Sequence, residues 1–383
     1  MSCYPVLEKE AMRPEHALKQ VHFFYPPFKD DSNFDSLRLA IERNLIYLER
    51  LDPSYAFKYG KDEFSVTEVM DSQRFFLSLI KKNSDPLQLE KDIKKHFRVY
   101  RATGRAGDSN VLFTGYFEPV FEGRLVQDDV YKYPIYAKPD DLLSINLSLF
   151  SNKYKGQRIF ARIEGKEVFP YFSRYQIEME KALKGRNLEI AWLKDPVDIA
   201  FLHIQGSGRI KLPDGTSICV GYAAKNGRPY HSIGKYLIDK GYISWEQMSM
   251  QAIRKTLGDN PEIVEEVLNQ NQSYIFFRIL DDLPIGSINI PVTPGRTIAL
   301  DRNLFPRGGL GFIVCQKPII DDEGNILEWI EFSRFVLNQD TGGAIKGAGR
   351  ADIFWGKGLY AEIAAGHLKH EGELYMLVKK PER

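Results

Sequence analysis

The sequence predicts a mainly β protein of the α+β class, with helices at the N-terminus and short strands over most of the rest. Apolar residues recur at helical spacing through the first hundred residues, and short β-like runs separated by turn residues dominate after Asn110. The chain has 383 residues, whereas one domain commonly holds ~100–200. We therefore expect two domains.

Three helices are expected in the first hundred residues. Phe34, Leu37, Ile41, Leu45 and Leu48 repeat with the spacing of an amphipathic helix. The expected helices begin at a Ser32/Asp35 cap, at Thr67 and at the pair Asp85-Pro86, and they end near Leu48, Ile80 and Tyr100.

Short strands are expected after Asn110, with three helices among them. A buried strand over residues 199–204 would lead into a turn at 206–208, and residues 210–220 would form a hairpin around Pro213-Asp214-Gly215. The helices are expected over residues 230–237, 248–257 (after a Ser244/Gln247 capping box) and 260–268. The strands are expected over residues 111–117, 133–136, 274–280, 297–300, 310–316, 326–332 and 375–379, and the last of these look like a small β-barrel.

Composition excludes several classes of function. Lys and Arg total 52 against 51 Asp and Glu, so the chain lacks the basic excess that nucleic-acid binding requires. The three cysteines are too few and too far apart for a disulfide framework, and the seven histidines show no metal-ligand spacing. We expect no metal and no cofactor.

The N-terminus leaves the question of membrane attachment open. No apolar run approaches the ~18–20 residues of a membrane span, and no signal-peptide core precedes Cys3. Cys3 is either the lipid-bearing cysteine of a processed lipoprotein or an incidental residue.

Residues 340–356 are the segment in which candidate catalytic residues are most concentrated. Glycines force turns and let a ligand approach the backbone, and Asp340 and Asp352 stand among them. Asp352 begins an apolar run that ends at Trp355, so its pKa should be raised, as a carboxylic acid that donates a proton to a glycosidic oxygen requires. From the residues alone, the structural explanations are favoured: Asp352 as a turn or strand-edge residue, Asp340 as the start of an Asx-turn, and Lys346 as a solvated lysine.

Two further loops have the composition of cleft linings. Tyr116 and Phe117 could stack on sugar rings, and Gln205 and Ser207 could bind hydroxyl or acetamido groups, although ordinary turns would contain the same residues. A serine hydrolase is not expected, because Gly206-Ser207-Gly208 lacks the G-x-S-x-G frame.

Taken together, these segments resemble the membrane-bound lytic murein transglycosylase A family with its C-terminal three-aspartate (3D) domain. The resemblance covers most of the chain. It rests on Gly115-Tyr116-Phe117-Glu118-Pro119, Tyr133-Pro134-Ile135-Tyr136, Gln205-Gly206-Ser207-Gly208, Gly221-Tyr222 with Ser232-Ile233-Gly234-Lys235, residues 271–277, Asp301-Arg302 and residues 340–356.

The resemblance implies a double-psi β-barrel domain from residues 1–120 and 280–383, with a second β-rich domain (121–279) inserted and a large groove between the two. It makes Asp352 the catalytic acid/base and Asp340 its helper in the same cleft. The substrate-binding residues would be Gly115, Tyr116, Phe117, Glu118, Gln205, Gly206, Ser207, Gly208, Lys346, Gly347 and Trp355.

The implied reaction is exo-acting, non-hydrolytic cleavage of the bond between N-acetylmuramic acid and N-acetylglucosamine in peptidoglycan, which leaves 1,6-anhydromuramyl ends. The expected partners are peptidoglycan glycan strands and other cell-wall enzymes, and the expected location is the periplasm, with a lipid on Cys3 anchoring the protein to the outer membrane. Two alternatives are a hydrolase of the same polymer, with Asp340 activating water, and a non-catalytic wall-binding barrel.

Overall fold

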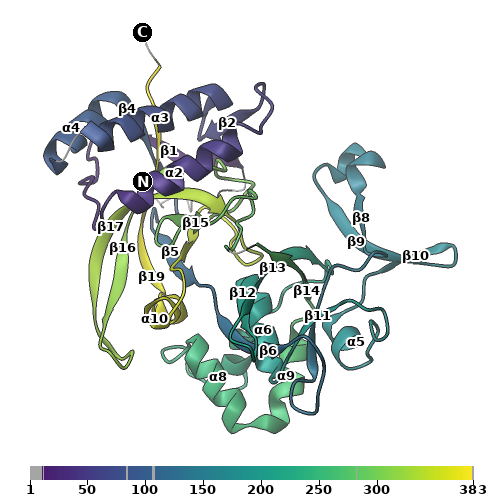
Figure 1. Cartoon of the computed structure of the whole chain (residues 1–383). Helices are drawn as coiled ribbons and strands as arrows, with labels where there is room; N and C mark the ends of the chain where they lie inside the picture. Colours follow the sequence, from purple (N-terminus) through teal and green to yellow (C-terminus); the bar gives the residue numbers. More distant parts are fainter. Residues whose placement is uncertain (1–10, 12, 83–84, 106–107, 282, 382–383) are drawn as a thin grey trace, which may run out of the picture. The chain divides into compact units, whose positions relative to one another are not determined.

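The structure is a computed structural model that describes residue 11 and residues 13–82, 85–105, 108–281 and 283–381. The chain divides into two compact units (Figure 1). The first joins residues 1–117 to residues 285–383, and the second comprises residues 118–284. Cys3 lies outside the described residues.

A closed six-stranded β-barrel forms the centre of the first unit. Its strands follow the order β19-β16-β17-β15-β18-β5, and β5 pairs back onto β19 to close the ring. This confirms the expected barrel and the mainly β, α+β class. The barrel strands are β5 (Val111–Tyr116), β15 (Thr297–Ala299), β16 (Leu310–Ile320), β17 (Ile326–Asp340), β18 (Arg350–Phe354) and β19 (His370–Lys379), and β1 (Leu18–Val21) and β4 (Phe97–Ala102) extend the sheet beyond β19.

Helices from the N-terminal segment cover this barrel. Apolar side chains of three of them pack on β16, β17 and β19 in one cluster, which includes Leu37, Phe76, Ile93, Phe312 and Phe335. The remaining elements of the unit are α1 (Pro14–Ala17), α2 (Asp35–Leu48), α3 (Val66–Lys82), α4 (Pro86–His96), α10 (Leu359–His367) and the hairpin β2 (Ala56–Tyr59) with β3 (Asp62–Ser65).

Two details of the expected helices are wrong. Ser32 does not cap α2, because the N-cap residue is Phe34 and makes no side-chain capping bond. Asp85 does cap α4, with its side chain accepting from the Leu87 N–H, but the helix ends at His96. The chain from Phe97 instead forms β4, which pairs with β19.

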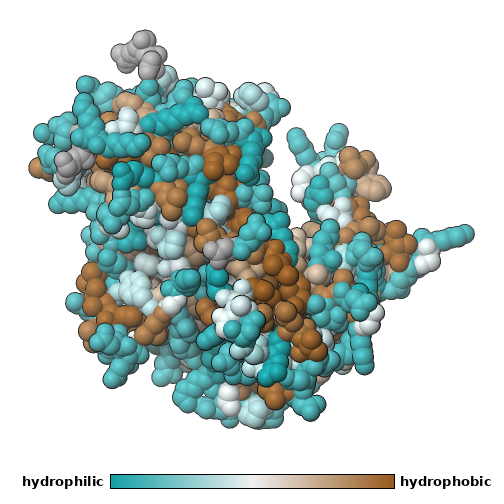
Figure 2. Space-filling model, viewed as in Figure 1, coloured by the Kyte–Doolittle hydropathy of each residue, from teal (hydrophilic) through white to brown (hydrophobic). Residues whose placement is uncertain are grey.

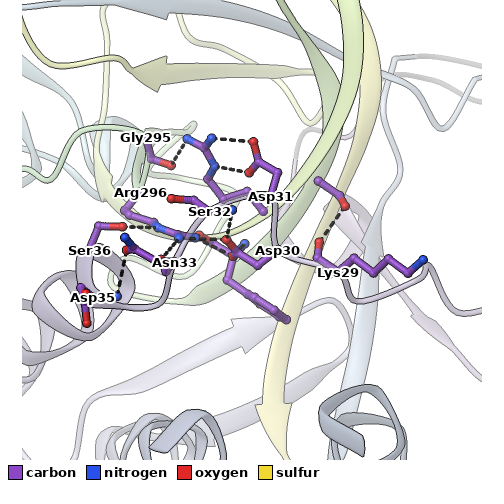
Figure 3. Close-up of polar contacts among 12 residues, drawn as sticks. Lys29, Asp30, Asp31, Ser32, Asn33, Asp35, Ser36, Gly295 and Arg296 are labelled. Carbon is purple, nitrogen blue, oxygen red and sulfur yellow. Dashed lines mark hydrogen bonds and ion pairs between the residues drawn. The ribbon is translucent and has the colours of Figure 1, made fainter. Parts of the chain in front are cut away.

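Ion pairs fasten the chain before α2 to the barrel (Figure 3). Arg296 binds Asp30 through both terminal guanidinium nitrogens, at 2.6 and 2.9 Å, and both side chains are only 1% exposed. Asp31 accepts from Arg334 on β17 and from Lys317 on β16. Residues far apart in the sequence are thereby held together at the base of α2.

A six-stranded sheet in the order β14-β13-β12-β6-β11-β7 organises the second unit, beside a small sheet β10-β9-β8. Apolar residues of the larger sheet and its helices, among them Ile135, Leu193, Leu202 and Phe277, form its main core. The strands are β6 (Val120–Arg124), β7 (Tyr133–Tyr136), β8 (Leu143–Asn146), β9 (Arg158–Glu164), β10 (Glu167–Pro170), β11 (Glu189–Leu193), β12 (Ser207–Lys211), β13 (Ser217–Lys225) and β14 (Ile275–Leu280). The helices are η1 (Leu147–Leu149), η2 (Asn152–Tyr154), α5 (Arg174–Glu178), α6 (Pro196–Gln205), α7 (Ile233–Asp239), α8 (Met250–Asp259), η3 (Pro261–Ile263) and α9 (Val264–Gln270).

The buried strand expected over residues 199–204 is wrong, because this segment belongs to α6. Asp195 caps the helix at the Val197 N–H, Pro196 occupies the first turn, and Gly206 ends it in the left-handed conformation at φ 76°. Nearly every α6 side chain is buried, which hides the helical period. The hairpin around Pro213-Asp214-Gly215 is confirmed by the antiparallel pairing of β12 with β13.

The capping box expected before residue 248 is also corrected. Ser244 accepts from the Gln247 N–H, but the helix starts later, at Met250, where Ser249 caps it by accepting from the Ala252 N–H. Throughout the part of the chain that the structure describes, no helix is long and apolar enough to cross a bilayer.

Candidate active site

Strand register in the barrel places Asp340 and Asp352 on either side of one residue. Asp352 lies opposite Thr114 in the parallel pair of β18 and β5, and opposite Ala299 in the antiparallel pair of β18 and β15. Ala299 in turn pairs with Asp340 at the end of β17. The barrel therefore brings the two predicted aspartates together.

Strand alternation selects the side chains that share this face. On β5, Val111 and Phe113 are fully buried, whereas Thr114 and Tyr116 are half-buried. On β18, Ala351 and Ile353 are fully buried and the half-buried residues are Arg350 and Asp352.

Asp352 has one oxygen bound and one free. The Thr114 hydroxyl donates a short hydrogen bond to Oδ1, and Arg350 donates to the Thr114 hydroxyl at 3.3 Å. Oδ2 accepts no hydrogen bond from any side chain or backbone N–H within the described ranges. Burial, with a smaller contribution from the charge of nearby Asp340, raises the pKa of Asp352 to about 6 against the lowering effects of Thr114 and Arg350. The raised pKa predicted from the sequence is confirmed.

Asp340 is held at both oxygens. Oδ1 accepts from the backbone N–H of Thr341 at 2.8 Å and of Ser287 at 3.0 Å, and Oδ2 accepts from the Tyr116 hydroxyl at 2.8 Å. Burial raises the pKa of Asp340, and these hydrogen bonds oppose the rise. The contacts reach distant segments, so the simple Asx-turn does not describe them.

Tyr116 acts here as a hydrogen-bond donor to Asp340. Burial and the adjacent carboxylates hold the pKa of its hydroxyl well above the usual value, so the hydroxyl stays protonated. Its ring lies 5.1 Å from that of Phe354, which fixes its position on the face of the barrel. The hydroxyl donates to Asp340, and the residue as a whole is half-buried.

Trp355 supports the site from within the core. A Cβ on Gly115 would lie 2.7 Å from the Trp355 ring, so this contact requires glycine. Trp355 is 8% exposed and Phe117 6%. Neither ring offers an open face of the kind that sugar stacking needs, and a role of Phe117 and Trp355 in substrate binding stays a prediction.

Asp301 pins the glycine-rich loop before β18. Its Oδ2 accepts from the Gly347 N–H at 3.0 Å and its Oδ1 from the Asn303 N–H at 3.0 Å. Lys346, next in the loop, has an exposed side chain that makes no ion pair with the residues described. This exposure is compatible with both explanations of Lys346, a ligand-binding residue and a solvated lysine.

The other predicted binding residues belong to the second unit. Glu118 is 4% exposed and pairs with Arg209 at 3.3 Å, and Gln205 contacts the sulfur of Met250 through Nε2 at 3.3 Å. Gly206 and Ser207 form the turn from α6 into β12, and a Cβ on Gly208 would lie 2.6 Å from Leu202. These contacts explain the motif structurally, and a role in binding stays a prediction.

Sequence reasoning missed Thr114 and Ser287. Thr114 stands two residues before Tyr116, so the two-residue period of a strand would have placed both on one face. Ser287 contributes a backbone N–H from a loop more than fifty positions before Asp340, and no side-chain motif signals such a contact.

Comparison with known proteins decides the family. Residues 112–278 match the model of the MltA specific insert domain, and residues 296–378 match the 3D domain. Over 288 residues the chain is 33% identical to the membrane-bound lytic murein transglycosylase A of Vibrio cholerae, an alignment that covers 73% of this chain and 69% of that protein. The chain belongs to the membrane-bound lytic murein transglycosylase A family.

Solved structures agree with this assignment to the lytic murein transglycosylase A family. The membrane-bound lytic murein transglycosylase from Agrobacterium tumefaciens superimposes with a TM-score of 0.73 at 31% identity, covering 91% of this chain and 97% of that one. The MltA of E. coli with bound chitohexaose superimposes with a TM-score of 0.69 at 25% identity, covering 98% and 97%. The family is one of peptidoglycan-cleaving enzymes, which confirms the enzyme class expected from the sequence.

Proposed function

We propose that the protein cleaves the β-1,4 bond between N-acetylmuramic acid and N-acetylglucosamine in peptidoglycan without water, with Asp352 as both acid and base. One observation carries this proposal: the carboxyl of Asp352 has a pKa of about 6 and a free Oδ2. Such a group is substantially protonated in mildly acidic solution and can take the proton back later in the same cycle.

The first step is proton donation. Asp352 Oδ2–H donates its proton to the glycosidic oxygen, the bond from this oxygen to the muramyl C1 breaks, and positive charge builds at C1. The Thr114 hydrogen bond stabilises the carboxylate that remains, because a hydrogen bond to the charged form favours that form. Asp352 thus becomes the base for the next step.

The second step closes the sugar. The muramyl C6 hydroxyl attacks C1 and gives its proton to the Asp352 carboxylate, which restores the acid and leaves a 1,6-anhydro ring. Because the nucleophile belongs to the same sugar, proximity replaces the activated water that a hydrolase needs.

Asp340 has the contacts of a positioning group. Three donors, from Tyr116, Ser287 and Thr341, occupy its two oxygens. A carboxylate held in this way has less freedom to activate water as a general base. We assign to it the orientation of the C6 hydroxyl and of Asp352, and this assignment favours the transglycosylase over the hydrolase.

The family supports a proposal for the substrate and for the place of action. The E. coli relative was solved with chitohexaose, a glycan chain, and the relatives are named membrane-bound. We therefore propose peptidoglycan glycan strands as substrate, a periplasmic location, and anchoring to the outer membrane through a lipid on Cys3, where other cell-wall enzymes would be partners. Intact-mass measurement of the protein from its native membrane tests for the lipid.

Digestion of purified murein tests the reaction. Mass spectrometry should find soluble muropeptides that end in 1,6-anhydromuramic acid. Reducing ends alone would identify a hydrolase, and the absence of soluble products would identify a wall-binding module. Either result would contradict the proposal.

A further inference from the structure

The second unit carries an arm formed by residues 143–164, which comprises β8, η1, η2 and β9. In Figure 1 this arm projects from the rest of its unit and ends in the two short helical turns. β8 pairs with β9 along four residues, and β10 pairs with the other edge of β9. The arm therefore has a paired stem and a distinct tip.

The tip presents two adjacent apolar side chains to solvent. Leu149 is 83% exposed and Phe150 is 75% exposed, and Tyr154 and Ile159 nearby are 38% and 44% exposed. Figure 2 shows hydrophobic surface gathered at this tip. Single exposed apolar residues are ordinary, but a leucine and a phenylalanine side by side at the end of a projection leave apolar surface in water without a compensating contact.

The backbone of the tip is ordered. Asn146 caps η1 by accepting from the Ser148 N–H at 3.1 Å, and the Ser148 hydroxyl accepts from the Gly156 N–H at 2.9 Å. Ser151 caps η2, and the Leu147 N–H donates to the Gln157 carbonyl at 3.0 Å. These bonds fix the backbone of the turns on both sides of Leu149 and Phe150, whose side chains are exposed there.

The arm is also basic. The arm contains four basic residues, Lys153, Lys155, Arg158 and Arg162, and one acidic residue, Glu164 at its base, in a chain whose net charge is only +1. Arg158 is hydrogen-bonded to Ser144, and Arg162 to Glu164. Lys153 and Lys155 are exposed and form no ion pair with the described residues, so two positive charges are available beside the apolar tip.

We propose that this tip docks on the surface of an anionic lipid bilayer. Leu149 and Phe150 enter the headgroup region, while Lys153 and Lys155 bind lipid phosphates. A convex apolar tip beside cations is the arrangement of interfacial membrane anchors, whereas a protein partner would have to supply a pocket for it. The proposal depends on neither Cys3 nor the chemistry of Asp352.

Vesicle co-sedimentation tests the proposal with the full chain, in a preparation chosen by intact-mass measurement to carry no lipid on Cys3. The vesicles contain phosphatidylcholine alone or with about one third phosphatidylglycerol, whose negative charge attracts basic residues. We expect binding to the anionic vesicles that weakens as salt is raised. K153Q/K155Q should lower the partition coefficient about fivefold per lysine, and L149S/F150S should lower it at least about tenfold.

Matched changes elsewhere serve as controls. L327S removes a leucine that is 65% exposed in the first unit, and K235Q removes an exposed lysine; both variants should bind as the unchanged protein does. Murein cleavage by the two tip variants should be unchanged, which separates this proposal from the proposed function.

Three outcomes overturn the proposal: no binding to anionic vesicles, equal binding to neutral and anionic vesicles, or tip variants that bind as strongly as the unchanged protein. Purified sacculi provide a further arm of the experiment. If the tip variants lose binding to sacculi and keep binding to vesicles, the tip contacts the cell wall instead.

Discussion

The Thr114 hydroxyl on β5 donates a hydrogen bond to Oδ1 of Asp352 on β18, across a parallel strand pair that sets the two residues opposite each other. Burial favours the neutral acid, and this hydrogen bond favours the carboxylate. The balance leaves the pKa of Asp352 at about 6. This pair and the neighbouring pair of Tyr116 and Asp340 are therefore the residues whose substitution should change activity.

Asp352→Asn should abolish cleavage. General acid–base catalysis contributes about 10²–10⁴-fold, and one group supplies both proton transfers here, so we expect at least about a 10³-fold fall in the rate of muropeptide release. Binding to sacculi should be retained. A variant that still clears murein at the unchanged rate would show that Asp352 does not transfer the proton.

Activity should fall as pH rises through about 6. Asp352 must be protonated to start the reaction, so kcat/KM should drop about tenfold per pH unit above the pKa of the free enzyme. A profile of kcat/KM on soluble glycan strands between pH 4 and 8, a range set around the pKa of about 6, measures this. A rate that rises through the same interval would contradict an acid role.

The same shift predicts that Asp352→Asn stabilises the fold at neutral pH. The folded-state pKa lies above the ordinary 3.8, so between the two values the folded protein holds a proton that the unfolded chain has lost, and stability decreases as pH rises through this window. Removing the charge should add roughly 1–3 kcal/mol to the free energy of unfolding at pH 7. Urea unfolding measures it, and D71N, at an exposed aspartate, should change stability by less than about 0.5 kcal/mol.

Thr114→Val should move the pH profile to higher pH. The substitution keeps the side-chain shape and removes the donor that stabilises the charged form, so the pKa of Asp352 rises further. The rate at the optimum should fall about tenfold, because a hydrogen bond to a charged group contributes about 1.5–3 kcal/mol. Thr114→Ser, which keeps the hydroxyl, should have the profile and the rate of the unchanged protein. If Thr114 had a purely structural role, Thr114→Val would leave the midpoint of the pH profile unchanged.

Tyr116→Phe should lower kcat about 10–100-fold with little change in KM, because Asp340 loses the donor that orients it. Tyr100 is a matched control, since its hydroxyl donates a hydrogen bond of 2.6 Å to Asp62, which is not one of the two site aspartates. Y100F should leave kcat unchanged. Equal losses of kcat in both variants would mean that the effect comes from destabilised structure.

Much of the fold was accessible from local sequence, and the failures have physical causes. Periodicity located α2 and α3, because each has one polar face. It failed for α6, where neighbours cover almost the whole circumference and the apolar run reads as a strand. It also could not show that β17 continues to Asp340, since pairing with β16 and β15 sustains the strand there.

The site was predicted in part. Glycines and an apolar run around Asp352 were enough to predict its raised pKa, and the family resemblance ranked it above Asp340. The contacts of Thr114 and Ser287 could not be found in this way. The barrel fold brings β5 to β18, and the chain before β15 to Asp340 at the end of β17, from distant parts of the sequence. The burial of Phe117 and Trp355 was not foreseen either, since burial depends on packing that a motif does not contain.

Digestion of murein in water enriched with heavy oxygen tests the central claim most directly. If Asp352 accepts the proton of the sugar's own C6 hydroxyl while that oxygen attacks C1, mass spectrometry will find anhydromuramyl ends that carry no heavy oxygen. Muramyl ends that have gained one heavy oxygen atom would show that water attacked C1, and would contradict the account.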